Sequence, residues 1–173
     1  MPAPALRLVC FAALYGAMYW ALSSFWGTGL AHFVIDTCTV APAAWLARGL
    51  TGNGQIVAAG ASLQAPDGSI RVLYGCEGTD VLMVLLAALM AAPGSWRGKC
   101  SGILAGIVLV YLLNQTRVLA LFYAVRRAPA WFGAIHGLIA PMVVVIVVVA
   151  FFLAWLRWTA PSPVSADVAA TAA

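Results

Sequence analysis

The sequence predicts an all-α integral membrane protein, a bundle of about four to five transmembrane helices with a small extracytoplasmic cap that contains a β-hairpin. Of its 173 residues, 64% are hydrophobic and 8% are charged, whereas soluble domains are about 45–50% apolar and about 25% charged. The net charge of +4 is dispersed, without a block of Lys or Arg. This composition excludes an ordinary soluble domain, a disordered chain and a basic nucleic-acid-binding domain.

The first apolar run covers residues 6–26. A run of about 20 residues is long enough to cross the hydrocarbon core of a bilayer. Tyr19, Trp20 and Trp26 lie near its end, as expected of an interfacial aromatic belt. The competing interpretation is a signal peptide with a cleavage site at residues 21–23. The length and the aromatic end favour a retained helix.

Residues 27–75 have a different character and form the predicted cap, rich in Gly, Thr, Ser and charged side chains. Within it, residues 31–50 are amphipathic and contain Pro42, so they form either an interfacial helix or a short extra span. A Pro-Asp-Gly turn at residues 65–68 separates two β-prone segments and predicts a hairpin. We therefore expect a single domain over residues 1–158, with a disordered tail of Ala, Pro and Ser at 159–173.

Three further apolar runs cover residues 79–93, 100–125 and 136–158. Four main spans place both termini on the same side of the membrane. The basic residues beside these spans favour cytoplasmic termini, namely Arg7, Arg97, Lys99 and Arg157. Arg126 and Arg127 argue for the opposite orientation. On balance we expect a multi-pass protein of the cytoplasmic (inner) membrane with its cap outside.

Three polar residues lie at the same face of this predicted bundle. Cys76 precedes the second span, Arg117 lies late in the third, and His136 begins the fourth. At about 1.5 Å per residue, each lies roughly 25–31 Å from the opposite edge of its helix. A sulfur, a guanidinium and an imidazole are therefore expected to share one pocket at the outer membrane–water interface.

These three side chains suit acyl transfer. A thiolate attacks a carbonyl, and a histidine takes and returns the proton. A guanidinium stabilises the oxyanion that develops, and Arg117 should face the bundle interior or reach the interface, because lipid exposure is costly. Each residue also has an ordinary interpretation: Cys76 as a small apolar filler, and Arg117 and His136 as interfacial residues.

Other polar residues have supporting or structural interpretations. Asn114 lies one turn before Arg117 and could hold it or a substrate amide. Glu77 and Asp80 are expected as helix N-terminal charges, with orientation of His136 or Arg117 as the alternative role. A polar cluster in the cap is not expected to bind metal, and a disulfide from Cys38 would block Cys76. The cluster consists of His32, Asp36 and Cys38.

The motifs Cys76-Glu77-Gly78 and Asn114-Gln115-Thr116-Arg117, followed by His136, resemble those of the exosortase/archaeosortase family. The resemblance covers residues 30–158. It implies a polytopic membrane cysteine protease or transpeptidase that needs no metal or organic cofactor. Its substrates would be exported proteins with a C-terminal sorting signal made of a short motif, a transmembrane helix and a basic tail. It also implies that Cys76 is the nucleophile, His136 the acid/base and Arg117 the oxyanion or substrate stabiliser.

Two other functions fit the sequence. One is a non-catalytic membrane subunit of a protein-sorting or polysaccharide-export assembly, in which Arg117 and His136 would form contacts between helices. The other is a small transporter with Arg117 in an anion path, which the gathering of polar residues at one face disfavours. The lipid bilayer is a partner in each case, nucleic acid in none, and the sequence does not indicate an oligomeric state.

Overall fold

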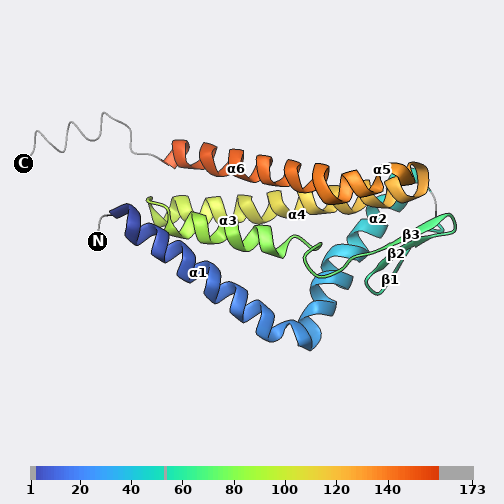
Figure 1. Ribbon diagram of the computed structural model, residues 1–173, viewed down its shortest axis with the longest axis horizontal. Coiled ribbons are helices and arrows are strands. Elements are labelled where there is room, and N and C mark those ends of the chain that lie inside the picture. Colours follow the sequence, from blue (N-terminus) through green and yellow to red (C-terminus); the bar gives the residue numbers. More distant parts are fainter. Residues whose placement is uncertain (1–2, 53, 160–173) are drawn as a thin grey trace, which may run out of the picture.

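The computed structural model describes residues 3–52 and 54–159. Figure 1 shows an elongated helical bundle with a small sheet at one end, and α1 begins at the end where α6 finishes. The helical elements are α1 (Ala3–Phe25), η1 (Trp26–Leu30), η2 (Phe33–Val40), α2 (Ala41–Thr51), α3 (Thr79–Ala91), α4 (Trp96–Arg127), α5 (Pro129–Ala134), η3 (Ile135–Ile139) and α6 (Ala140–Thr159). The strands are β1 (Val57–Ala59), β2 (Ser62–Ala65) and β3 (Gly68–Arg71).

Long apolar helices dominate the structure and confirm the predicted membrane class. Four of the described helices are long and apolar enough to cross a bilayer, and the shorter α3 is also apolar. α3 packs against α1 and α4, and α6 packs against α4. The long helices are Pro4–Phe25, Thr28–Thr51, Trp96–Arg127 and Pro129–Thr159.

Residues 31–50, which the sequence left open between two interpretations, belong to a continuous apolar helix over Thr28–Thr51. The chain leaves helical geometry at Thr28 (φ −93°, ψ −170°), so α1 and this helix meet at a kink. Pro42 lies directly after the π-helical segment η2, where the Ala41 N–H bonds to the Asp36 carbonyl five residues earlier. Such a local π-helical adjustment accommodates a proline inside an apolar helix. α2 packs against α4 and the sheet.

The cap contains a three-stranded antiparallel sheet in the order β1-β2-β3. The predicted turn is correct: Ala65 pairs with Gly68, and Pro66 and Asp67 form the connection between β2 and β3. The β-prone segments at residues 55–60 and 69–74 do not pair with each other, because β2 lies between them and pairs with both. A second tight turn, which was not predicted, follows β1, and Gly60 adopts a left-handed φ of 55° there.

The last span begins earlier than predicted. The helix runs from Pro129 to Thr159, so His136 lies two turns inside it and does not open it. Proline is favoured in the first turn of a helix, because its fixed φ suits that position and no N–H is lost there. α4 is likewise longer than the predicted run and begins after Ser95, whose Oγ accepts a hydrogen bond from the Gly98 N–H at 3.2 Å. The predicted tail from residue 160 onward lies outside the described residues.

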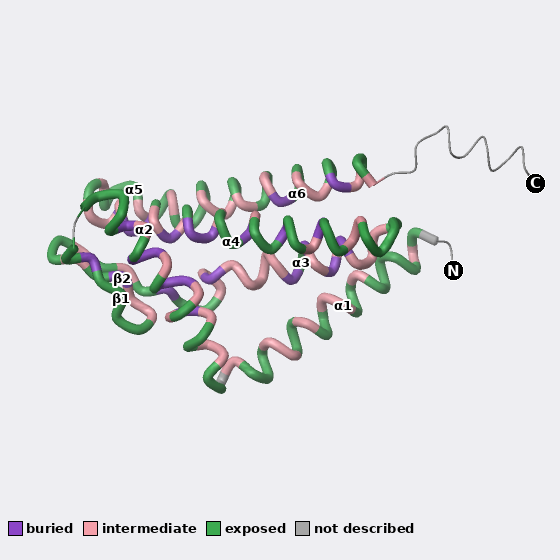
Figure 2. Tube along the Cα trace, turned by 180° about the vertical axis from the view of Figure 1, so that it is seen from behind, coloured by how far each residue is buried: buried purple, intermediate pink, exposed green. Residues whose placement is uncertain are grey.

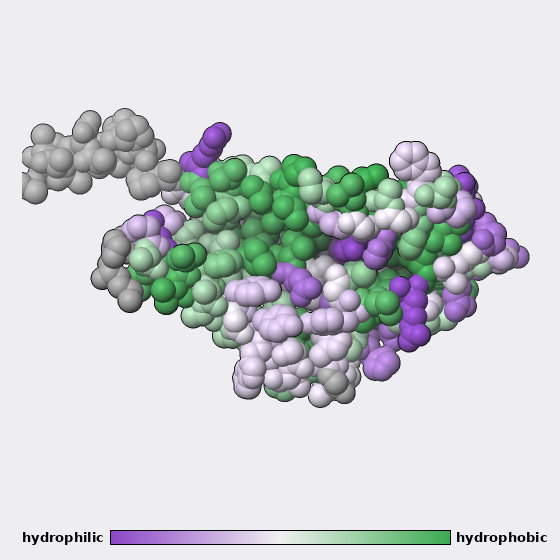
Figure 3. Space-filling view, viewed as in Figure 1, coloured by the Kyte–Doolittle hydropathy of each residue, from purple (hydrophilic) through white to green (hydrophobic). Residues whose placement is uncertain are grey.

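Two apolar clusters divide the molecule. Following the predicted orientation, we use the name outer half for η2, α2, the sheet and α4 beyond Arg117, and the name membrane half for α1, α3, α4 up to Arg117 and α6. Figure 2 shows buried residues where α2, the sheet and α4 meet, whereas α1 and most of α6 are exposed or half-buried. Hydrophobic residues form a broad band along α6, and hydrophilic residues collect at the end with the sheet (Figure 3). The outer cluster contains Ile35, Val40, Ala43, Ala44, Ala47, Ile56, Leu63, Val72, Val118 and Phe122.

Candidate active site

Cys76 lies in the short loop between β3 and α3. Its N–H donates to the Leu73 carbonyl at 2.9 Å, which closes a turn. Gly78, at the N-cap of α3, has a φ of 85°, which side chains rarely adopt. A Cβ on Gly78 would also lie 3.1 Å from Cγ of Asn114. Glycine two residues after Cys76 therefore lets the loop approach α4 closely, and the Asn114 amide forms the surface that the loop packs against.

The structure brings Cys76, Arg117 and His136 together from three separate elements. The Cys76 Sγ lies 3.8 Å from Nε2 of His136. On its other side, Nη2 of Arg117 lies 4.0 Å from the same sulfur. Cys76 and Arg117 are half-buried, whereas His136 is exposed. A thiol, an imidazole and a guanidinium in mutual proximity supply a nucleophile, a proton acceptor and a hydrogen-bond donor for an oxyanion.

A cavity of about 340 Å³ opens beside these three side chains, within the range of roughly 300–1,000 Å³ that ligand pockets occupy. Its walls come from β3 and the residue after it, from α4, and from the helix that carries His136. Apolar side chains make up most of the remaining lining. The lining residues are Ser69, Ile70, Arg71, Val72, Cys76, Arg117, Val118, Leu121, Val125, Phe132 and His136.

Phe132 orients the imidazole of His136. The two rings stack with their centroids 5.6 Å apart and an interplanar angle of 15°. They lie one turn apart on the same helix, so the stacking restricts the rotation of the imidazole next to the sulfur. Phe132 was not among the site residues predicted from the sequence. The only feature there that pointed to it was its position, four residues before a candidate catalytic histidine.

The predicted supporting carboxylates do not contact the basic residues of the site. Glu77 is 7% exposed, and one of its carboxylate oxygens accepts a hydrogen bond from Thr79 Oγ1 at 2.6 Å. Asp80 lies in the first turn of α3, as expected for a charge that favours a helix N-terminus. Within residues 3–52 and 54–159, the ion pairs join other residues, so neither carboxylate orients Arg117 or His136 by a salt bridge.

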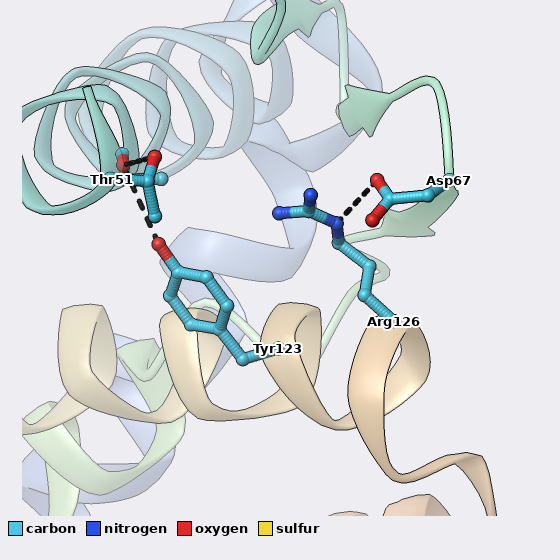
Figure 4. A network of polar contacts seen from close by, with 5 residues as sticks. Thr51, Asp67, Tyr123 and Arg126 are labelled. Carbon is cyan, nitrogen blue, oxygen red and sulfur yellow. Dashed lines mark hydrogen bonds and ion pairs between the residues drawn. The ribbon is translucent and has the colours of Figure 1, made fainter. Parts of the chain in front are cut away.

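An ion pair fastens the tip of the sheet to α4, beside the cavity (Figure 4). Nε of Arg126 donates to Oδ1 of Asp67 at 2.6 Å. The same guanidinium lies over the rings of Phe122 and Tyr123, 5.0 Å and 6.0 Å from their centroids. The hydrogen bond from Arg126 lowers the pKa of Asp67 below its ordinary value. Sequence reasoning treated Arg126 only as a charge at the end of a span.

A second contact fixes the outer half on α4. Gln115 is buried, and its Nε2 lies 3.3 Å from the carbonyl oxygens of Cys38 and Thr39 on η2. Cys38 and Cys76 are both free thiols, so the disulfide considered from the sequence is not formed. In the same region, Nδ1 of His32 lies 3.1 Å from Oδ2 of Asp36. Gln115, adjacent to the Asn114 of the motif, is therefore a structural residue.

Comparisons with protein-family models, with curated proteins and with solved structures give no match for this chain. The resemblance to a family therefore depends on the motif residues alone.

Proposed function

We propose that this protein is a membrane-embedded cysteine peptidase or transpeptidase of the exosortase/archaeosortase type. The observation that carries the proposal is the position of the Cys76 sulfur, 3.8 Å from an imidazole nitrogen and 4.0 Å from a guanidinium nitrogen. Few functions other than nucleophilic catalysis need a thiol, an imidazole and a guanidinium at one point beside a cavity.

The reaction follows from these positions. His136 Nε2 accepts the thiol proton, and Sγ of Cys76 forms a bond to the carbonyl carbon of the substrate. The carbon–nitrogen bond then breaks, the imidazolium returns its proton to the departing amine, and a thioester is left on Cys76. Water or an acceptor amine attacks the thioester carbon and gives a proton to His136. The carbon–sulfur bond then breaks, the imidazolium returns the proton to the Cys76 sulfur, and the product leaves. The first product is thus an amine, and the second is an acid or an amide.

Arg117 is the proposed oxyanion stabiliser. Its Nη2 lies 4.0 Å from the sulfur, and its side chain lines the cavity. A guanidinium in this position can donate a hydrogen bond to the carbonyl oxygen that becomes negative during attack.

The proposed substrates are exported proteins with a C-terminal transmembrane sorting signal. Basic residues at one end of the bundle favour the cytoplasmic side for that end, which supports a cavity on the extracytoplasmic face of the inner membrane. A tail anchored in the same bilayer would present its scissile bond at the level of the cavity. The residues at the cytoplasmic end include Arg7, Arg97, Lys99 and Arg157.

The test compares cells that carry Cys76→Ala with cells that carry the matched Cys10→Ala. Cys10 lies in α1, which takes no part in the cavity lining. C-terminal peptide mapping of exported proteins should find tails retained in the Cys76→Ala cells that are removed in the wild type and in Cys10→Ala. Identical sets of C-termini in all three strains, with the variant present in the membrane, would instead favour a non-catalytic subunit.

A further inference from the structure

The free edge of β3 forms one wall of the cavity that contains Cys76. The residues from Ser69 to Val72 line it consecutively, opposite the helix that carries His136. In the sheet order β1-β2-β3, β3 is an edge strand and pairs only with β2 among the described residues. An edge strand exposes main-chain donors and acceptors that can pair with another chain.

The register identifies which main-chain groups point toward this edge. The Val72 N–H donates to the Ala61 carbonyl at 2.8 Å, so the main chain of Val72 faces β2. Successive residues of an antiparallel strand turn their N–H and C=O groups to opposite sides. The main-chain groups of Ile70 therefore also face β2, whereas those of Ser69 and Arg71 face the free edge. Both of these residues are exposed.

The edge is held in place without a substrate. The ion pair between Asp67 and Arg126 fastens the start of β3 to α4, and the turn at Cys76 N–H and Leu73 O follows its end. A strand fixed at both ends loses little further freedom on pairing, which favours binding. The edge is also continuous with the proposed catalytic cavity, so a chain paired there would lead to the Cys76 sulfur.

We propose, on the basis of the proposed peptidase function, that the substrate binds as an extended peptide that adds to β3 as a fourth strand. β3 runs from the hairpin tip toward the Cys76 loop (Figure 1). A tail that enters the membrane after its scissile bond runs in the same direction, so the pairing is parallel. The N–H of one peptide residue donates a hydrogen bond to the Ser69 carbonyl, and the carbonyl oxygen of the same residue accepts a hydrogen bond from the Arg71 N–H.

This mode of binding explains how one site can accept different chains. The main-chain hydrogen bonds are common to all extended peptides, whereas only alternate side chains point to the same side of a strand. Side chains that face the cavity meet Val118, Leu121 and Val125 of α4. The apolar lining therefore selects by the size and polarity of every second residue.

The test measures alkylation of Cys76 in the purified full-length protein in detergent. The probes are acetyl-trialanine chloromethyl ketone and two N-methyl derivatives of it. One derivative carries the methyl group on the amide nitrogen of the second alanine, and the other carries it on that of the third. Sγ bonds to the methylene carbon, and chloride leaves. The readout is the alkylation rate of each probe divided by the rate of iodoacetamide. We expect N-methylation at one of the two positions to lower this ratio about fivefold, as for the loss of one hydrogen bond, and at the other position to have little effect.

Variants of the protein provide a second readout. Arg71→Pro removes the main-chain N–H that faces the edge and should lower the ratio for the unmethylated probe about fivefold, more than Arg71→Ala, which removes only the side chain. Ala58→Pro is the matched control, because Ala58 lies on the opposite edge strand, pairs with Leu63 and does not line the cavity. It should leave the ratio unchanged.

The outcomes separate this inference from the proposed function. Equal effects of the two N-methyl positions, or an unchanged ratio in a folded Arg71→Pro variant, would overturn strand addition while leaving the peptidase proposal intact. If the ratio is unchanged in that variant but a dimer is lost, the free edge of β3 binds a second copy of the chain. That result would also overturn strand addition by the substrate. If Arg71→Pro does not fold, the N-methyl probes decide with the wild type. If Cys76 reacts with iodoacetamide no faster than Cys10, the proposed function fails, and this inference fails with it.

Discussion

The outer half of the molecule packs its apolar side chains inward, whereas the membrane half turns many of them outward. In the outer half, Leu63, Val72 and Phe122 from the sheet side and α4 meet in a buried cluster. In the membrane half, Val145 and Leu153 of α6 are about half exposed. Burial from water drives the first kind of packing, but lipid tails offer no such drive, so helices there associate through close contacts at small residues.

We expect the largest difference in stability between the two halves from the substitutions Phe122→Ala and Leu153→Ala. Phe122 is 0% exposed, and its loss should destabilise the protein by about 3–5 kcal/mol, because a cavity is left in the outer cluster. Leu153 is 51% exposed and should matter far less, because lipid or detergent fills the space. Thermal unfolding in micelles measures both. Equal destabilisation would show that the two halves do not pack differently.

Gly102→Ala tests the close contact of helices in the membrane half. Nε1 of Trp155 on α6 donates to the Gly98 carbonyl of α4 at 3.0 Å, and its indole covers Gly102, so an added methyl group would collide with it. We expect a loss of about 1–3 kcal/mol from overpacking. Gly16→Ala in α1 is the control, since nothing lies within 4 Å of the added methyl group. Thermal unfolding in the same detergent should show that Gly102→Ala is less stable than Gly16→Ala. Similar stabilities would contradict the close contact between the Trp155 indole and Gly102.

Gly78→Ala tests the boundary between the two halves. A φ of 85° should cost an alanine about 1–2 kcal/mol, and the methyl group would push the loop away from Asn114. We therefore expect slower labelling of Cys76 by a membrane-impermeant maleimide as well as lower stability. Gly54→Ala, at an open position with ordinary φ, should change neither. A Gly78→Ala variant with wild-type labelling would show that the loop does not need the close approach.

Asp67→Asn should have the smallest effect, because the Asp67 side chain is 55% exposed and water competes for its carboxylate. The Arg126 hydrogen bond lowers the pKa of Asp67 from 3.8, so the folded state binds this proton less readily than the unfolded state. The stabilisation is therefore fully present above about pH 4 and is lost as the pH falls through the lowered value. Unfolding of wild type and variant should differ near neutral pH and converge in acid. A constant difference across that range would exclude the ion pair as its cause.

The fold and the position of the site followed from the sequence to different degrees. Apolar runs near bilayer length predicted three of the four long helices, because every backbone group must be paired inside lipid, and helices do this locally. The predicted span at residues 79–93 is the shorter helix α3, and the long helix Thr28–Thr51 had been left open between two interpretations. Alternating topology placed Cys76, Arg117 and His136 at one level. The Pro66–Asp67 turn was also predicted, because its residue types have strong conformational preferences.

The rest could not be predicted because it depends on contacts between distant segments. The pairing of β2 with both neighbours follows from the short turn at Gly60, whose residue types resembled an ordinary loop. Arg126 looked like a loop charge, and only the packed sheet brings Asp67 to it. Phe132 acquires its role through the position of His136 two turns inside a helix that the apolar pattern did not show as helical from Pro129.

The length of α4 has a consequence for the setting in which this protein operates. Its 32 residues extend about 48 Å, well beyond a hydrocarbon core of roughly 30 Å. Arg117 and Arg126 both lie on this helix, so a tilt imposed by a thinner bilayer would move both side chains together. Lipid composition is therefore an experimental variable to be controlled whenever the reactivity of this protein is compared between preparations.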